Sequence, residues 1–264
     1  MRSTAVITSR LVSALLAALL AAPAAPAAAA RPVRARVACG AGSAMRRVEA
    51  LVGGEVEVFC VRSADGKRHG AYRRVYRNGV SAAVGAYRDG LRHGRWTYYT
   101  AGALKDRQGR YRGGQRVGLW RWWHTNNKVA LEGRYLEGRR HGLWREWHKR
   151  GKETLRLSYK RGALHGPWTG WYAFGALSGR GRFDHDLAVG PWQHWHERGT
   201  RAEAGPYRDG QRHGRWVFFH KNGRRALEGE YRHDQRVGRW LEWDESGKTL
   251  APIDYASGRR ASAR

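Results

Sequence analysis

The sequence lacks the motifs by which most enzymes are recognised. It contains no serine or cysteine nucleophile motif and no glycine-rich loop of the kind that cradles phosphate groups. Helical periodicity is also missing, and the 35 glycines would weaken any helix. These absences argue against an enzyme and against a helical fold, and no cofactor is expected.

Ordinary core residues are scarce as well, because the 264 residues include only five Phe and two Met. Disorder does not follow, since disordered segments are poor in aromatic residues and this chain has 13 Trp and 12 Tyr. Those rings need somewhere to be buried or to stack. We therefore expect an ordered fold.

Acidic residues are few, 22 against 50 basic ones, and the formal net charge is +28. Only eight of the basic residues are Lys. The guanidinium group of Arg is the better one for stacking on aromatic rings and for bidentate contact with carboxylate or phosphate. Such a field attracts polyanions, including lipid head groups, lipopolysaccharide, nucleic acid and acidic proteins.

The beginning of the chain has the composition of a secretory signal peptide over residues 1–30. Arg2 and Arg10 flank a polar start, an apolar run follows, and Ala and Pro lead to a cleavage site near Ala30. The apolar run is short for a membrane span, although an uncleaved anchor is an alternative. Export to the periplasm or the cell exterior would favour a disulfide between Cys39 and Cys60. Two free thiols would be expected only if the signal prediction is wrong.

From residue 67 onward the chain is repetitive. A His-Gly or Val-Gly pair recurs every 24 residues, and no insertion interrupts the series. Eight repeats occupy residues 67–260, and their positions are counted from the first residue of each pair. These first residues are His69, His93, Val117, His141, His165, Val189, His213 and Val237.

The aromatic and glycine columns of the repeat are the strictest. Position 4 is Trp in seven repeats, position 19 is Tyr in seven, position 17 is Gly in six, and position 7 is aromatic in seven. The residues predicted to hold the repeats together are Trp96, Trp120, Trp144, Trp168, Trp192, Trp216 and Trp240, with Tyr87, Tyr111, Tyr135, Tyr207 and Tyr231. We expect positions 4 and 7 to form the core of the fold.

Each repeat has two short segments rich in Trp, Tyr and β-branched residues, separated by Gly or Asn, which is typical of a β-hairpin. The sequence thus predicts an all-β fold, an elongated single-layer antiparallel sheet of tandem hairpins with about sixteen strands in a row of roughly 75 Å. The strand register predicts that Trp at position 4 covers the Gly at position 17 on a neighbouring strand. Stability should be nearly one-dimensional, with capped ends.

Both ends of the repeat array depart from the pattern. Residues 55–68 resemble the second half of a repeat, and the predicted disulfide would staple residues 31–54 over the open edge of the sheet. The N-terminal cap is therefore placed at residues 31–66. Residues 261–264 form a polar tail.

The unit GxWxxWxxxGxxxxxGxYxxG resembles the bacterial variant of the MORN repeat, over residues 55–260. The N-terminal cysteine pair followed by "DGKRHG" is similar to secreted or envelope members of that group. The resemblance implies an elongated sheet of hairpins that binds or scaffolds other molecules. MORN repeats are associated with membranes and phospholipids in some proteins and with protein assembly in others.

Three candidate sites remain. His194 and His196 share a strand face and form a weak metal site that lacks further ligands at a recognisable spacing. Trp122 falls at variable position 6 and is expected to be an exposed aromatic. Arginines at position 24 would form a cationic ladder, for which solubility is the alternative explanation. The ladder comprises Arg68, Arg92, Arg116, Arg140, Arg212, Arg236 and Arg260.

Together these features predict a non-enzymatic, exported repeat scaffold that binds an acidic protein through its concave or Arg-lined face. The first alternative is peripheral binding to anionic lipid or lipopolysaccharide. The second alternative is binding of nucleic acid or another polyanion, without sequence preference and with strong salt dependence.

Overall fold

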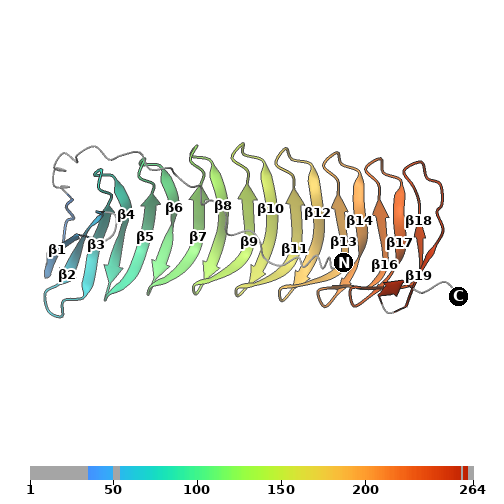
Figure 1. Ribbon diagram of the computed structural model, residues 1–264. Coiled ribbons are helices and arrows are strands. Elements are labelled where there is room, and N and C mark those ends of the chain that lie inside the picture. Colours follow the sequence, from blue (N-terminus) through green and yellow to red (C-terminus); the bar gives the residue numbers. More distant parts are fainter. Residues whose placement is uncertain (1–34, 50–53, 257, 261–264) are drawn as a thin grey trace. The chain divides into compact units, whose positions relative to one another are not determined.

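The computed structural model describes residues 35–49, 54–256 and 258–260. Within these residues the chain forms one antiparallel sheet of twenty strands and no helix, so the predicted all-β fold is confirmed (Figure 1). No helix of the length and apolar character that a membrane span requires occurs in this described part. The predicted signal peptide and the polar tail lie outside the described residues.

The strands follow one another along the sheet in chain order (Figure 1). Each pairs with the next, except that β15 and β16 both pair with β14. The cap and the first four repeats contain β1 (Ser43–Glu49), β2 (Val56–Arg62), β3 (Arg68–Val75), β4 (Ser81–Arg88), β5 (Leu91–Tyr99), β6 (Lys105–Arg112), β7 (Gln115–Trp123), β8 (Val129–Leu136), β9 (Arg139–Trp147) and β10 (Glu153–Lys160). The last four contain β11 (Ala163–Trp171), β12 (Leu177–Asp184), β13 (Leu187–Trp195), β14 (Arg201–Arg208), β15 (Gln211–Arg212), β16 (Gly214–Phe219), β17 (Arg225–Arg232), β18 (Gln235–Glu242), β19 (Ile253–Ala256) and β20 (Arg259–Arg260).

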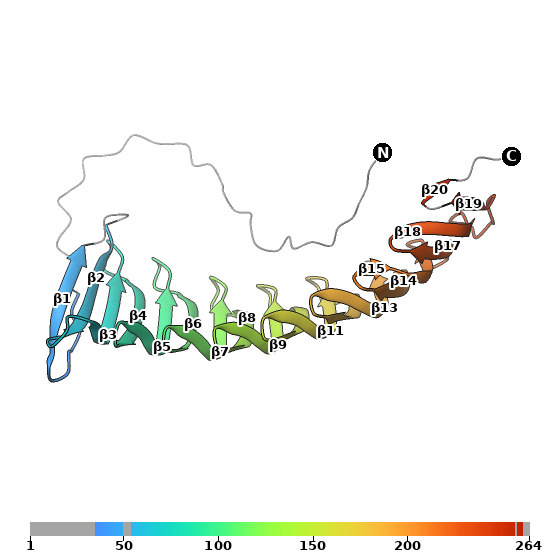
Figure 2. The same ribbon diagram turned by 90° about the horizontal axis from the view of Figure 1, so that it is seen from below.

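Each repeat is one hairpin, and a two-residue turn joins it to the next repeat (Figure 2). At the first of these turns Asp89 and Gly90 both have positive φ, 52° and 80°, as a type I′ turn requires. The first strand of the following hairpin already begins at Leu91. The first strand of each hairpin therefore starts before the His-Gly or Val-Gly pair, earlier than the Trp at position 4 indicates.

Alternation along the strands gives the sheet two different faces. Trp96 at position 4 and Tyr98 at position 6 point to one side and are buried, whereas Tyr99 at position 7 points to the other. We call the side that carries positions 4, 6, 15, 17, 19 and 24 the indole face. The side that carries positions 3, 5, 7, 16 and 18 is the cationic face.

This division corrects two predictions. Positions 4 and 7 do not form one core, because an odd spacing along a strand places them on opposite sides of the sheet. Trp122, expected to be exposed, shares the indole face with Trp120. Its ring lies 5.9 Å from that of Trp120 and 5.7 Å from that of Trp144.

The core is a row of indoles lying on strand glycines. Trp120 is completely buried, and a Cβ added to Gly109 would lie 2.1 Å from its ring. Its Nε1 donates a hydrogen bond of 3.2 Å to the carbonyl of Arg110. Trp120 pairs in register with Gly133 of its own hairpin, but its ring covers Gly109 of the preceding repeat. Each indole thus connects two consecutive repeats.

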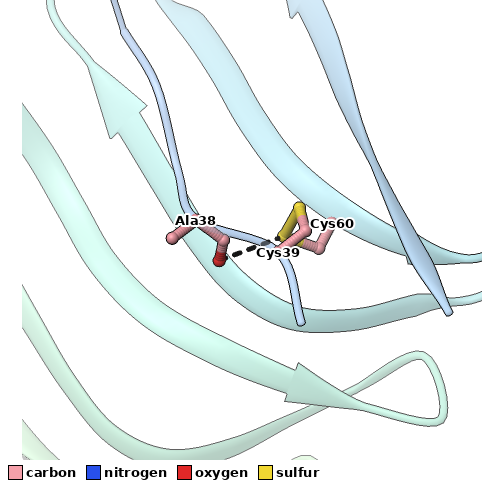
Figure 3. The surroundings of a disulfide bond; sticks show 3 residues. All are labelled: Ala38, Cys39 and Cys60. Atoms are coloured by element: carbon pink, nitrogen blue, oxygen red, sulfur yellow. Dashed lines mark hydrogen bonds between the residues drawn. A yellow bond between two sulfur atoms is a disulfide. The ribbon is translucent and has the colours of Figure 1, made fainter. Parts of the chain in front are cut away.

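The N-terminal cap is joined to the sheet by the predicted disulfide between Cys39 and Cys60, which is confirmed (Figure 3). Ala35 packs against Val56, Val58 and Val75 on the cationic face of β2 and β3. Residues 43–49 pair with the outer edge of β2 and extend the sheet by one strand, β1.

Candidate anion-binding face

The predicted arginine ladder lies on the indole face, beside the tryptophans. The guanidinium of Arg116 stacks 4.7 Å from the ring of Trp120 and donates to the hydroxyl of Tyr135 at 3.0 Å. Arg92, Arg140, Arg212 and Arg236 each lie over the indole of the following repeat at 4.4–5.0 Å. This arrangement gives the column a packing role.

The two end members of the ladder differ from the rest. Arg68 lies 4.1 Å from the ring of Phe59 and forms an ion pair of 3.0 Å with Glu57. Arg260 is exposed and has no side-chain partner in the described part of the chain. Most guanidinium groups of the ladder already contact aromatic rings, which leaves fewer of them free to contact an anion. Anion binding by the ladder stays a prediction.

Charge is retained along the ladder despite burial. Burial disfavours the charged guanidinium of Arg116, but hydrogen bonds from it to Tyr111 and Tyr135 outweigh that effect and raise its pKa. The pKa of Arg236 is raised in the same way, with burial opposed by Tyr231 and Tyr255. Arg116 and Arg236 are therefore cations held between the aromatic rings of adjacent repeats.

The indole face is interrupted in its middle. Leu157 replaces the glycine at position 17, and Trp168 lies instead over Gly170 and Gly179, with a Cβ on Gly179 only 2.7 Å from its ring. Leu164 and Ala188 replace the ladder arginines there. The buried aromatic residues consequently form two clusters, with Phe59 to Trp120 in one and Trp192 to Trp240 in the other.

The predicted metal ligands His194 and His196 lie near this interruption but do not converge. The His194 ring stacks on Trp192 at 6.0 Å, and its Nε2 is buried without a partner. Burial lowers the pKa of His194. The Nε2 of His196 lies 3.1 Å from the carbonyl of Phe219 and links two repeats. Neither imidazole belongs to a group of potential ligands in the described residues.

The cationic face carries a second, half-buried aromatic row at position 7. Its first member, Val75, is buried because the N-terminal cap covers it. Five of the other members are stacked with cations: Lys105 lies 4.8 Å from Trp123, Arg145 lies 5.1 Å from Trp147, and the same contact recurs at Trp171, Trp195 and Phe219. These rings and the cations on them form an open surface.

Carboxylates partly neutralise the centre of this face. Arg121 and Glu132 form an ion pair of 2.9 Å between β7 and β8. These two side chains, Trp123 and Trp147 line a shallow cleft of about 450 Å³ together with Lys128, Val129 and Gly151. The cleft lies between consecutive position-7 rings.

Another row on the cationic face has no counter-charge. Arg110, Arg134 and Arg182, all at position 18, are exposed, and their side chains have no ion pair or hydrogen bond in the described part of the chain. Arg95 stands directly opposite Arg110 across the hairpin and is equally unpaired. Like charges directly opposite one another destabilise a sheet. An external anion would relieve that repulsion.

Sequence reasoning missed this row, since Arg at position 18 occurs in only three of the eight repeats. The signal that could have found it is strand alternation. Positions 3 and 18 have the opposite parity to the buried Trp and Gly columns and pair with each other across each hairpin. Arginine there must face solvent.

Comparison with known proteins supports the sequence resemblance. The MORN repeat variant family model matches residues 116–137, which cover β7, β8 and the turn between them. No curated protein matches the chain. The other repeats share the 24-residue spacing and the hairpin of the matched unit, and most of them share its indole-on-glycine contact. Residues 116–137 are therefore similar to the MORN repeat variant, and the neighbouring hairpins are built on the same 24-residue spacing.

Proposed function

We propose that the protein is an exported, non-enzymatic repeat scaffold that binds an acidic protein along its cationic face. MORN-repeat proteins are generally non-catalytic and often bind membranes or proteins. The disulfide and the lack of a membrane-spanning helix among the described residues are compatible with export. The observation that carries the proposal is the row of unpaired arginines at position 18.

An extended acidic protein suits this surface better than a compact ligand does. Arg110, Arg134 and Arg182 recur along the sheet in the register of the repeats, and the cleft beside Arg121 on the same face is shallow and open. A chain with carboxylates at intervals could contact several hairpins at once. Each exposed pair is worth at most about 1 kcal/mol, so affinity would come from their number.

The test compares two variants of equal charge. Replacing Arg110, Arg134 and Arg182 with Gln should weaken binding of fluorescein-labelled poly-L-glutamate roughly tenfold in an anisotropy titration near physiological salt. The control replaces Arg77, Arg150 and Arg198 with Gln. These side chains are exposed and unpaired in the described part of the chain, and they lie in the turns that join the two strands of a hairpin. Equal loss in both variants would mean that net charge alone binds the peptide and would contradict the proposal.

A second candidate, attachment to anionic lipid or lipopolysaccharide, is favoured by the half-buried tryptophans on the same face. Indoles prefer the membrane interface, and juxtaposed cations are attracted to anionic head groups. Replacing Trp123 and Trp147 with Ser should then abolish co-sedimentation with phosphatidylglycerol vesicles and leave poly-L-glutamate binding intact. No co-sedimentation of the unaltered protein would exclude this candidate. A stronger interaction with nucleic acid than with either probe would favour the polyanion alternative.

A further inference from the structure

One turn between repeats departs from all the others in its chemistry. Position 20 is Asp184 in the fifth repeat, whereas the other seven repeats carry Arg, Leu, Lys or Ala there. His185 and Asp186 follow, and Asp186 replaces the glycine found in most of these turns. His165, on the paired strand β11, lies beside Asp184 because Gly166 and Phe183 are register partners.

Three potential ligands converge at this turn. The Nδ1 atoms of His165 and His185 lie 2.8 Å and 2.7 Å from the same carboxylate oxygen of Asp184. The ligand atoms of all three residues lie within 4.8 Å of one another, the single such group in the described part of the chain. The Nδ1 of His165 is buried and makes no hydrogen bond of good geometry, although it is so close to the carboxylate.

Asp184 and His185 are open to solvent. The side chains of His185 and Asp184 are 72% and 51% exposed, so an ion can reach them from solvent.

The backbone of the turn is fixed before any ion binds. Asp186 has a φ of 68°, which few residues other than glycine adopt. Its amide donates to the carbonyl of Leu164 at 3.0 Å, and its carboxylate accepts from the Leu164 amide at 2.7 Å. This pair of bonds ties His185 to the strand that carries His165.

We propose that His165, Asp184 and His185 bind a divalent transition-metal ion of the Zn²⁺ class. Two imidazole nitrogens and one carboxylate oxygen suit Zn²⁺, Cu²⁺ or Ni²⁺ better than Mg²⁺ or Ca²⁺, which prefer oxygen ligands alone. Three protein ligands would leave one position of a tetrahedral site open to water or to another molecule.

The chain contains a closely matched site that should not bind the ion. In the seventh repeat His213 and His233 face each other with ring centroids 5.6 Å apart, compared with 5.3 Å for His165 and His185. Asp234 makes the same two bonds to Arg212 that Asp186 makes to Leu164. Arg232, however, occupies the position of Asp184, and its cation would repel a metal ion.

Isothermal titration of the full-length, tag-free protein with Zn²⁺ tests the proposal. We expect one equivalent to bind, with affinity lowered at least about tenfold by Asp184→Arg or His185→Gln and unchanged by His233→Gln. Circular dichroism would verify that the variants fold. The proposal is overturned if the protein binds no stoichiometric Zn²⁺ or if Asp184→Arg binds it as tightly as the unaltered protein does.

The matched turn also allows a gain of binding to be measured. Arg232→Asp should supply the missing carboxylate and raise the stoichiometry from one Zn²⁺ to two. A gain of bound Zn²⁺ cannot be caused by unfolding of the variant. Substituting Co²⁺ for Zn²⁺ should give the visible absorption of a tetrahedral site in the unaltered protein and none in Asp184→Arg. A Co²⁺ spectrum that Asp184→Arg leaves unchanged would contradict the assignment of ligands.

Discussion

The contact between an indole and a strand glycine carries the packing of the indole face at the residue scale. The Trp120 ring occupies the space that any side chain at position 109 would need. The chain itself contains the exception: where Leu157 replaces this glycine, Trp168 lies over two other glycines, Gly170 and Gly179. A larger residue at position 17 is therefore tolerated only where the ring has another place to lie.

Gly109→Ala should accordingly destabilise the protein. A Cβ 2.1 Å from the Trp120 ring forces the indole to move, and overpacking of this kind costs about 1–3 kcal/mol. Urea unfolding monitored by Trp fluorescence would measure the change. Gly102→Ala is the control, because the nearest atom would be 3.8 Å away and its φ is not positive. Equal midpoints for the two variants would refute the packing argument.

Neighbouring strands are joined by side-chain contacts on both faces, and on the cationic face one carboxylate connects β9 to β10. Glu153 accepts hydrogen bonds from Arg145 at 3.2 Å and 2.9 Å, and from Arg156 at 2.9 Å through both of its oxygens. Its side chain is only 16% exposed. The hydrogen bonds from Arg156 and then Arg145 outweigh burial and lower the pKa of Glu153 to about 2.

This depressed pKa predicts a pH dependence. The contribution of Glu153 should be fully present above its usual pKa of 4.5 and be lost as the pH falls toward about 2. Because both arginines are more than one third exposed, water weakens the cluster to about 1 kcal/mol at neutral pH.

Glu153→Gln should therefore lower the free energy of unfolding at pH 7, with the difference from the unaltered protein shrinking between pH 4.5 and 2. Urea unfolding at a series of pH values would measure it. Glu197→Gln, at an exposed residue without a partner in the described part, should change little at any pH. A pH-independent effect of Glu153→Gln would rule out the ionised cluster as its cause.

For the molecule as a whole, contacts run from each hairpin to its neighbours, so stability should be local. The cap at the N-terminal end illustrates this. The disulfide holds Ala35 and Val37 over Val56, Val58 and Val75, which lie on β2 and β3. Among the described residues, the buried cluster from Trp192 to Trp240 shares no member with this one.

Reducing the disulfide should therefore loosen one end of the array. A bridge that closes a loop of this length stabilises by about 3 kcal/mol, and the effect should fall on the strands that it joins. Hydrogen exchange with mass spectrometry should show faster exchange in β2 and β3 and unchanged exchange in β16 and β17. Uniformly faster exchange along the chain would contradict one-dimensional stability.

Much of this molecule could be predicted from its sequence because a repeat constrains the same unit many times. Two aromatic segments separated by Gly or Asn indicate a hairpin, and the recurrence of this unit every 24 residues in eight repeats predicts a continuous sheet. The disulfide between Cys39 and Cys60 could be predicted from the expected compartment. The candidate sites could not, because they lie where repeats differ and a pattern describes only what they share.

The sequence by itself determined the strand pattern, the tandem hairpins and the columns that stack, since these follow from local periodicity and turn chemistry. Only the tertiary structure decided which side chains share a face. It placed Trp122 among the buried indoles, joined the arginine ladder to the aromatic rings and left Arg110 unpaired. It also brought His165 to Asp184 and His185 across a hairpin. These outcomes depend on register and on distances between neighbouring strands, which no single segment of the chain contains.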